Sequence, residues 1–225
     1  MSLIALARLL QLCSQALPIG GYSHSQGLEA AIEHGAVRDE ASLLRWIADV
    51  LEFSMKSFEI PCLVSMAVAW SGSDPAAIRT LNDEYLSARE SAELRAAAVQ
   101  MGFSLRELLR VLPDFPKDIL DTLGSTPEPS LPCAWSAATT AWDIQPQESV
   151  MGYLWAWAEN QVLVAMKAVP LGQSAGQRVL LELGSKIVQV AADTASGGTG
   201  YSNFSPGLAI LSSRHETQYS RLFRS

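Results

Sequence analysis

A serine and a histidine stand side by side in Gly21-Tyr22-Ser23-His24-Ser25, a pairing that suggests nucleophilic catalysis. The segment resembles the G-x-S-x-G turn that exposes a nucleophilic serine after a strand, but Ser25 replaces the last glycine and no strand-like run precedes it. Adjacent side chains at the start of a helix point apart, which argues against Ser23 and His24 acting as nucleophile and base. We interpret the segment as a turn leading into a capped helix, with a small helical serine hydrolase as an alternative.

The histidines could also bind a metal, because imidazole is a common metal ligand. The three histidines, His24, His34 and His215, are scattered, and no H-x-x-x-H or H-E-x-x-H spacing occurs. The pair His215-Glu216 offers one edge of a site at most, and we interpret it as surface polarity. The sequence therefore predicts no metal site within the chain, while a transient site shared with a partner or a second copy stays open.

Paired carboxylates and a glycine-rich segment could support acid–base or phosphate chemistry. Glu90 and Glu93 would share one face of a helix, where Arg89 and Arg95 predict salt bridges rather than general acid–base catalysis. The segment Gly197-Gly198-Thr199-Gly200 is not followed by the Gly-Lys-Ser/Thr of a P-loop, so we interpret it as a flexible loop. The sequence predicts no catalytic centre, and any nucleotide chemistry would come from a partner.

Composition narrows the class of protein. Of the 225 residues, 48% are hydrophobic and 17% are charged, which predicts a folded chain with apolar surface left for a partner. The net charge of −7 argues against a general nucleic-acid binder, and no apolar run reaches the roughly 18 residues of a membrane span. Cys13, Cys62 and Cys133 form no C-x-x-C pair, which fits reduced thiols in a cytoplasmic protein.

The elements that must position these residues carry helical signals. Apolar residues recur at helical spacing, and no segment shows the alternation of a strand. An S-x-x-Q capping box at Ser23 predicts a helix start there, and Asp39 and Asp74 predict two more. Pro61 is expected to kink or end the second of these helices, and the third would run to about Gln100.

The second half of the chain has one proline-rich interruption. Prolines cluster between Pro113 and Pro132, which predicts a linker or long loop. Helices are expected over 133–142, from Pro146 to Pro170, and over 175–192. The fold class is therefore all-α, a single-domain bundle of about eight to ten helices over residues 1–225.

Three segments resemble the urease accessory protein F (UreF) family, in the family's order. They are Leu17-Pro18-Ile19-Gly20-Gly21-Tyr22-Ser23-His24-Ser25-Gln26-Gly27-Leu28-Glu29, then Glu159-Asn160 with Lys167–Gln173 and Gly176-Gln177, and finally Arg214–Ser225. The stretch Arg89–Arg95 also resembles the family's central motif, although Ser91 stands where threonine is frequent. The resemblance spans nearly the whole chain, and Pro113–Pro132 and the Gly197 segment are its least family-like parts.

The resemblance implies an all-helical, usually dimeric protein without catalysis of its own. Such proteins join the accessory protein UreD (also called UreH) and the GTPase UreG on the urease apoprotein, where nickel is inserted beside a carbamylated lysine. The resemblance therefore implies that this chain is a scaffold that bridges UreD and UreG and gates GTP-dependent nickel insertion. No cofactor is expected, because partners handle nickel and GTP. A nickel-carrying helical protein is a further alternative.

The end of the chain, 209–225, is expected to be a partner-docking tail. It is a poor core element, but its aromatic residues and arginines are types that dominate interface energies, so we expect it to order on binding. Arg221 would make a buried charge-assisted contact, with Tyr22 close to the same interface. Lys167 would either satisfy the carbonyls at a helix end or contact UreG. The predicted partner-binding residues are Tyr22, Lys167, Arg214, His215, Glu216, Tyr219, Arg221, Leu222, Phe223 and Arg224.

Overall fold

The computed structural model describes residues 1–193 and 201–225, and in these ranges the regular structure is helical, with no strand. The predicted all-α class is therefore confirmed, and the loop predicted at 197–200 lies outside the described residues. A 3₁₀ turn, η1 (Gly21–Ser23), and a π-helix, η2 (Leu51–Glu59), accompany the α-helices. The α-helices are α1 (Leu3–Cys13), α2 (Leu28–Glu33), α3 (Glu40–Val50), α4 (Ile60–Ser71), α5 (Pro75–Ser87), α6 (Ala92–Val111), α7 (Lys117–Gly124), α8 (Leu131–Ala141), α9 (Pro146–Ala168), α10 (Gln173–Asp193) and α11 (Pro206–His215).

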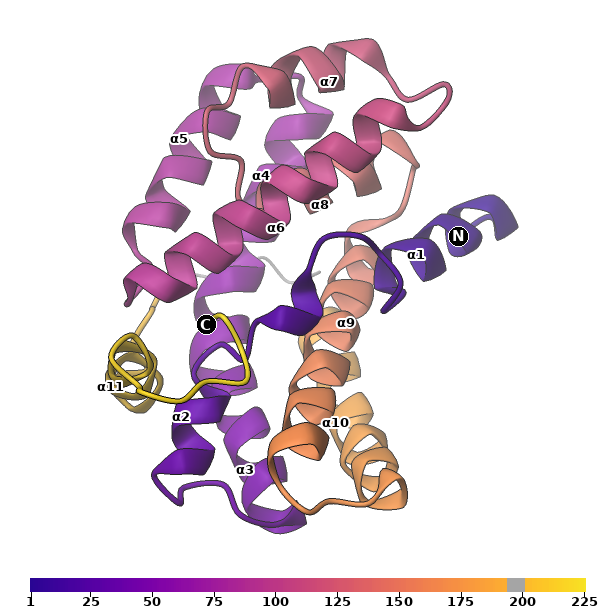
Figure 1. Cartoon of the computed structure of the whole chain (residues 1–225). Coiled ribbons are helices and arrows are strands. Elements are labelled where there is room, and N and C mark those ends of the chain that lie inside the picture. Colours follow the sequence, from indigo (N-terminus) through magenta and orange to yellow (C-terminus); the bar gives the residue numbers. More distant parts are fainter. Residues whose placement is uncertain (194–200) are drawn as a thin grey trace.

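Helix α9 is the axis of the fold and packs against α10, α1, α2, α3 and α4 (Figure 1). Pro146 stands in its first turn and Pro170 follows its end, as the sequence predicts. Proline suits a first helical turn because its missing N–H would be unpaired there anyway. Val150, Leu154 and Ala158 are completely buried along the helix. Burial of apolar surface around α9 is therefore the main stabilising contribution.

A second group of helices, α4 to α8, forms the other half of the molecule (Figure 1). Helix α6 crosses closely over the segment before α8, where a Cβ on Gly102 would lie 2.1 Å from the carbonyl oxygen of Pro129. Only glycine permits so close an approach. The proline-rich stretch contains α7, which packs against α6 and α8 and buries Leu123 completely. The prediction of a linker or long loop here is therefore wrong for α7.

The helix that starts after Asp39 does not end at Pro61. Asp39 caps α3 as predicted, with Ser42 N donating to its carboxylate at 2.8 Å. Helix α3, η2 and α4 then follow one another without a break, and Pro61 lies in the first turn of α4. The π-helix changes the backbone hydrogen-bond pattern just before Pro61, which has no N–H to donate.

The charged stretch at 88–91 interrupts a helix that was predicted to be continuous. Asp74 caps α5 as expected, but α5 ends at Ser87 and the Ser91 hydroxyl caps α6 by accepting a bond from Leu94 N at 3.1 Å. Glu90 lies in the break and Glu93 in the first turn of α6, so the two do not share a helix face as predicted.

The turn at 20–27 delays the start of α2. Ser23 does not cap a helix, because its hydroxyl donates to Gly20 O at 2.7 Å and α2 begins at Leu28. Gly20 has a φ of 76° and Gly27 a φ of 85°, which glycine adopts without strain. The predicted capping box is therefore wrong. The residues of the family-like motif that precede Leu28 lie in a turn and not in a helix.

Helix α1 projects from the body, with only one side packed on α9 (Figure 1). Ala5, Leu9 and Leu12 are buried, whereas Leu3 and Leu10 are exposed. No helix among the described residues is long and apolar enough to cross a membrane.

Candidate functional site

The first part of the predicted docking tail, up to His215, belongs to α11, and residues 216–225, which we call the tail from here on, return from α11 to the turn that precedes α2 (Figure 1). Arg224 N donates to Ser23 O at 2.8 Å, and Gln26 N and Ser25 N both donate to Ser225 O. The His24 ring lies 2.6 Å from the Ser225 hydroxyl, measured from Nδ1 to Oγ. Two motifs from opposite ends of the sequence therefore form one structure, which we call the tail junction.

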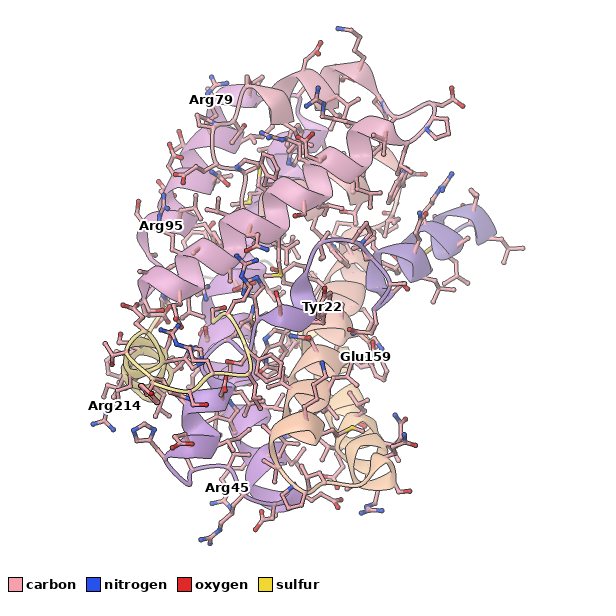
Figure 2. The ribbon with its side chains drawn as sticks, viewed as in Figure 1. Tyr22, Arg45, Arg79, Arg95, Glu159 and Arg214 are labelled. Carbon is pink, nitrogen blue, oxygen red and sulfur yellow. The ribbon has the colours of Figure 1, made fainter. Side chains whose placement is uncertain are left out.

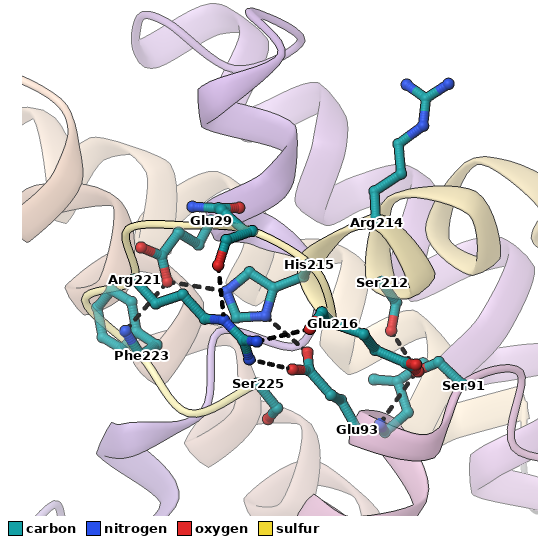
Figure 3. Close-up of polar contacts among 12 residues, drawn as sticks. Glu29, Ser91, Glu93, Ser212, Arg214, His215, Glu216, Arg221, Phe223 and Ser225 are labelled. Atoms are coloured by element: carbon teal, nitrogen blue, oxygen red, sulfur yellow. Dashed lines mark hydrogen bonds and ion pairs between the residues drawn. The ribbon is translucent and has the colours of Figure 1, made fainter.

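Glu29, in the first turn of α2, holds the tail. Its carboxylate accepts bonds from Leu222 N at 2.6 Å and Phe223 N at 3.0 Å, and it lies 3.0 Å from His215 Nε2 (Figure 3). The side chain is almost entirely buried. Hydrogen bonds to a charged acceptor are stronger than neutral ones, so this carboxylate fixes the course of the tail backbone.

His215 lies between two carboxylates (Figure 3). Its Nε2 faces Glu29, and its Nδ1 lies 2.6 Å from Glu93 Oε2. The side chain is 0% exposed, so its interpretation as surface polarity is wrong. A protonated imidazole, which has two donors, would satisfy both carboxylates at once. Sequence analysis missed this role because the partners are distant in sequence.

Arg221 and Glu216 attach the tail to α6. Arg221 Nη1 donates to Glu93 Oε1 at 2.6 Å and its Nη2 to Glu216 O at 2.6 Å. The Glu216 carboxylate accepts a bond from Ala92 N at 2.9 Å. Arg221 was predicted to make a buried contact with a partner, but in this structure its charge-assisted contact is half-buried and lies within the chain.

Phe223 is the apolar anchor of the tail and is buried in the core. Lys167, in the last turn of α9, places its Nζ 5.7 Å from the centre of the Phe223 ring. This distance fits a cation–π contact. Lys167 thus meets the tail of its own chain, a third possibility beside the two predicted for it.

The outer side of the tail junction remains exposed. Tyr22 is 60% exposed and Leu222 is 69% exposed, and Tyr219 is completely exposed. Arg214 points away from the buried cluster (Figure 3), and Arg224 is also exposed. The tail is therefore two-sided: its inner groups fix it to the body, and its outer aromatic, aliphatic and basic groups face solvent.

Ser23 and His24, which were considered for catalysis, form hydrogen bonds with different partners. The Ser23 hydroxyl donates to Gly20, whereas the His24 ring pairs with Ser225. Burial, and secondarily the Arg224 charge, lower the pKa of His24 to about 4. Among residues 1–193 and 201–225, no group of three or more histidine, cysteine or acidic side chains is arranged to hold a metal.

Arg89, for which a salt bridge was predicted, takes part in a buried charge cluster with Glu59 and Tyr153. Arg89 Nη1 donates to Glu59 Oε2 at 2.9 Å, and Tyr153 Oη donates to the other oxygen of Glu59. Burial raises the pKa of Tyr153 well above its usual value, so it remains a donor. Glu59 and Tyr153 also line a pocket that opens beside Tyr22.

Comparisons with known proteins agree with the motifs gathered at this site. The sequence model of the UreF family matches residues 37–184. The chain is 53% identical to the urease accessory protein UreF of Dechloromonas aromatica over 99% of this chain and 98% of that protein. It is 52% identical to the protein of the same name from Azoarcus sp. over 99% and 97%, and 47% identical to that of Janthinobacterium sp. over 98% of each. The chain therefore belongs to the UreF family.

Proposed function

We propose that this chain is a urease maturation scaffold that binds other proteins and carries out no catalysis itself. Its relatives are named urease accessory proteins, which supports a role in urease maturation. The finer proposal is that the chain bridges UreD (UreH) and the GTPase UreG and gates GTP-dependent nickel insertion into the urease apoprotein. Nickel and GTP are handled by these partners, so the chain itself requires no cofactor. It works in the cytoplasm and as a homodimer.

The observation that carries the proposal is the two-sided tail junction. Burying Phe223 and His215 holds the tail, while Tyr219 and Leu222 remain exposed beside Tyr22. Exposed aromatic and arginine side chains on a fixed backbone are suited to binding because little conformational entropy is lost on association. Arg214 and Arg224 add positive charge to a chain whose net charge is −7, which favours an acidic partner surface.

Co-purification of the full chain with UreD and UreG tests the proposal. Replacing Tyr219 and Leu222 together with alanine should weaken capture of UreD at least tenfold without changing helix content, because both side chains face solvent. Val111→Ala is the control, since Val111 is an apolar residue that is also strongly exposed, at the end of α6. Undiminished capture by the double variant would contradict the assignment of this surface.

Removing Arg214–Ser225 should also abolish capture, but the truncation is a less specific test. It deletes His215 and leaves Glu29 and Glu93 without their tail partners. Unpartnered buried charge destabilises a fold, so loss of binding could then follow from loss of structure. The double variant on the outer side avoids this difficulty.

A further inference from the structure

Both ring nitrogens of His215 face carboxylate oxygens. Nδ1 lies 2.6 Å from Glu93 Oε2, and Nε2 lies 3.0 Å from Glu29 Oε2. An ionised carboxylate can only accept hydrogen bonds, whereas a neutral imidazole has one donor nitrogen and one acceptor nitrogen. The two contacts together therefore need one proton more than a neutral histidine and two ionised carboxylates contain.

The other contacts of the two carboxylates place this proton on the ring. Glu29 accepts a bond from Leu222 N at 2.6 Å on one oxygen and a bond from Phe223 N at 3.0 Å on the other. Glu93 Oε1 accepts a bond from Arg221 Nη1 at 2.6 Å. Hydrogen bonds donated to a carboxylate favour its ionised form. The extra proton therefore belongs on the imidazole, which is an imidazolium while the tail is attached.

With this proton the charges of the buried cluster balance. The carboxylates of Glu29 and Glu93 face two cations, Arg221 and the His215 imidazolium. The His215 side chain is 0% exposed, and those of Glu29 and Glu93 are 6% and 13% exposed, so water has little access to replace a lost donor. Without the proton, the cluster would carry a net negative charge and a ring lone pair would face a carboxylate. Both changes destabilise a buried site.

The charged groups that surround the junction from the tail, α9 and α11 have contacts of their own. The Glu216 carboxylate accepts a bond from Ala92 N at 2.9 Å, and Lys167 Nζ lies over the Phe223 ring. Arg214 is exposed and points away from the cluster (Figure 2 and Figure 3). The two ring nitrogens are therefore left to the two carboxylates.

His24, the other buried histidine of the tail junction, stays in one charge state above about pH 6. Burial, and secondarily the Arg224 charge, lower the pKa of His24 to about 4. An unperturbed histidine titrates near about 6.5, so His24 is already neutral where such a ring loses its proton. A histidine-dependent change in the junction at neutral to alkaline pH would therefore come from His215.

We propose that His215 makes the tail junction a proton-dependent latch, which is closed while the ring is protonated and opens as the pH rises. A proton that the attached tail binds and the released tail does not bind makes the attachment weaker at higher pH. Opening would free the segment that carries Tyr219 and Leu222. The consequence for partners rests on the proposed function, because it assumes that a protein binds this segment. The latch itself is a property of the isolated chain.

NMR of the isolated full chain tests the latch. The nitrogen-15 signals of the His215 ring report its protonation, and we expect an imidazolium at about pH 6 and a neutral ring at about pH 8.5. Over the same range, protection of the Leu222 and Phe223 amides, relative to an unstructured peptide at the same pH, should fall by about tenfold while α9 stays protected. A neutral ring at about pH 6, or equal tail protection at both pH values, would overturn the inference.

Glu93→Gln separates the latch from a merely structural role. The glutamine amide can donate to Nδ1 of a neutral ring while its oxygen still accepts from Arg221, so no extra proton is needed. Tail protection in this variant should therefore agree within about twofold at the two pH values. Glu33→Gln, an equal charge change at an exposed position on α2, should keep the fall seen in the unaltered chain. The same fall in Glu93→Gln would overturn the inference, and if this variant leaves the tail unprotected throughout, the ring and amide signals of the unaltered chain decide.

The last experiment asks whether a partner responds to the latch. The unaltered chain should capture UreD about tenfold less well at about pH 8.5 than at about pH 6. Glu93→Gln should show a much smaller difference, which separates the latch from any effect of pH on UreD itself. Equal losses in both chains would overturn the regulatory role and leave the proposed function intact. If the unaltered chain captures no UreD at either pH, the proposed function fails, while the NMR measurements still judge the latch.

Discussion

The core around α9 and the tail junction are held together by different interactions. Residues such as Leu154 and Val150 contribute buried apolar surface, and many neighbours share the contact. At the tail junction, two carboxylates, Glu29 and Glu93, hold His215, Arg221 and the tail backbone by a few charge-assisted hydrogen bonds. Changes in the core should therefore lower the stability of the whole molecule, whereas changes at the junction should release the tail.

A cavity in the core should have the largest effect. Leu154→Ala removes a completely buried side chain and should lower the free energy of unfolding by about 2–5 kcal/mol. Urea denaturation measures the change, and the tail should stay attached in the native state. Leu181→Ala on the exposed side of α10 is the control and should change it by less than about 0.5 kcal/mol. A loss confined to the tail would contradict the division between the two regions.

Acid should lower the free energy of unfolding through His24, which pairs with Ser225 at the tail junction. Its pKa is lowered to about 4 in the folded chain, whereas an unfolded histidine titrates near about 6.5. The unfolded chain therefore binds more protons between these values, so stability is complete above about pH 6.5 and falls as the pH drops towards about 4. The total loss is about 3 kcal/mol, since one pKa unit corresponds to about 1.4 kcal/mol.

Unfolding in urea at pH 7 and pH 4.5 checks this dependence. His24→Asn removes the titrating ring and should make the difference between the two pH values smaller than in the unaltered chain. His34→Asn, at an exposed position after α2, should keep the original difference. An unchanged pH difference in His24→Asn would show that other groups control the acid response.

Removing one junction charge should release the tail with a smaller loss of stability. Glu29→Gln keeps an acceptor for the tail amides but removes the charge that faces His215. We therefore expect the free energy that attaches the tail to the body to fall by about 1–3 kcal/mol. Hydrogen exchange at Leu222 N and Phe223 N should accelerate, while α9 stays protected. The matched control is Glu33→Gln, an exposed position on the same helix. Equal acceleration in both variants would rule out Glu29 as the tail's attachment point.

Loss of the cation beside Phe223 should have the smallest effect. Lys167→Ala removes a cation–π contact worth about 0.5–1 kcal/mol and should leave helix content unchanged. The yield of activated urease should fall if the tail must be held in place to recruit partners. Lys186→Ala on α10 is the control. Global unfolding of Lys167→Ala would instead indicate that the lysine is needed for the fold.

Local signals in the sequence predicted the helical class and several boundaries correctly. Asp39, Asp74 and Pro146 act within one helical turn, so their effects can be read from neighbouring residues. Pro61 does not end the helical run that starts after Asp39, because it lies in the first turn of α4, directly after a π-helix that has no simple sequence signal. The continuous helix predicted through Arg89 is wrong because α5 ends at Ser87 and the Ser91 hydroxyl caps a new helix.

The sequence predicted only part of the site, because many of its contacts join residues that are far apart in the chain. The motifs at both ends of the chain identified Tyr22 and the tail, but their mutual contact depends on residues almost the whole chain apart. His215 was taken for a surface group because its type is polar, and only the approach of Glu29 and Glu93 explains its burial. The docking roles of the outer residues stay predictions.

The most direct test of the central claim is hydrogen exchange of the tail in the isolated, full-length chain. If Glu29 and Glu93 hold the tail before any partner arrives, the Leu222 and Phe223 amides should exchange much more slowly than in an unstructured peptide. Adding UreD should then slow them only slightly further. Exchange at unstructured rates in the free chain, with protection appearing only after UreD binds, would contradict the account.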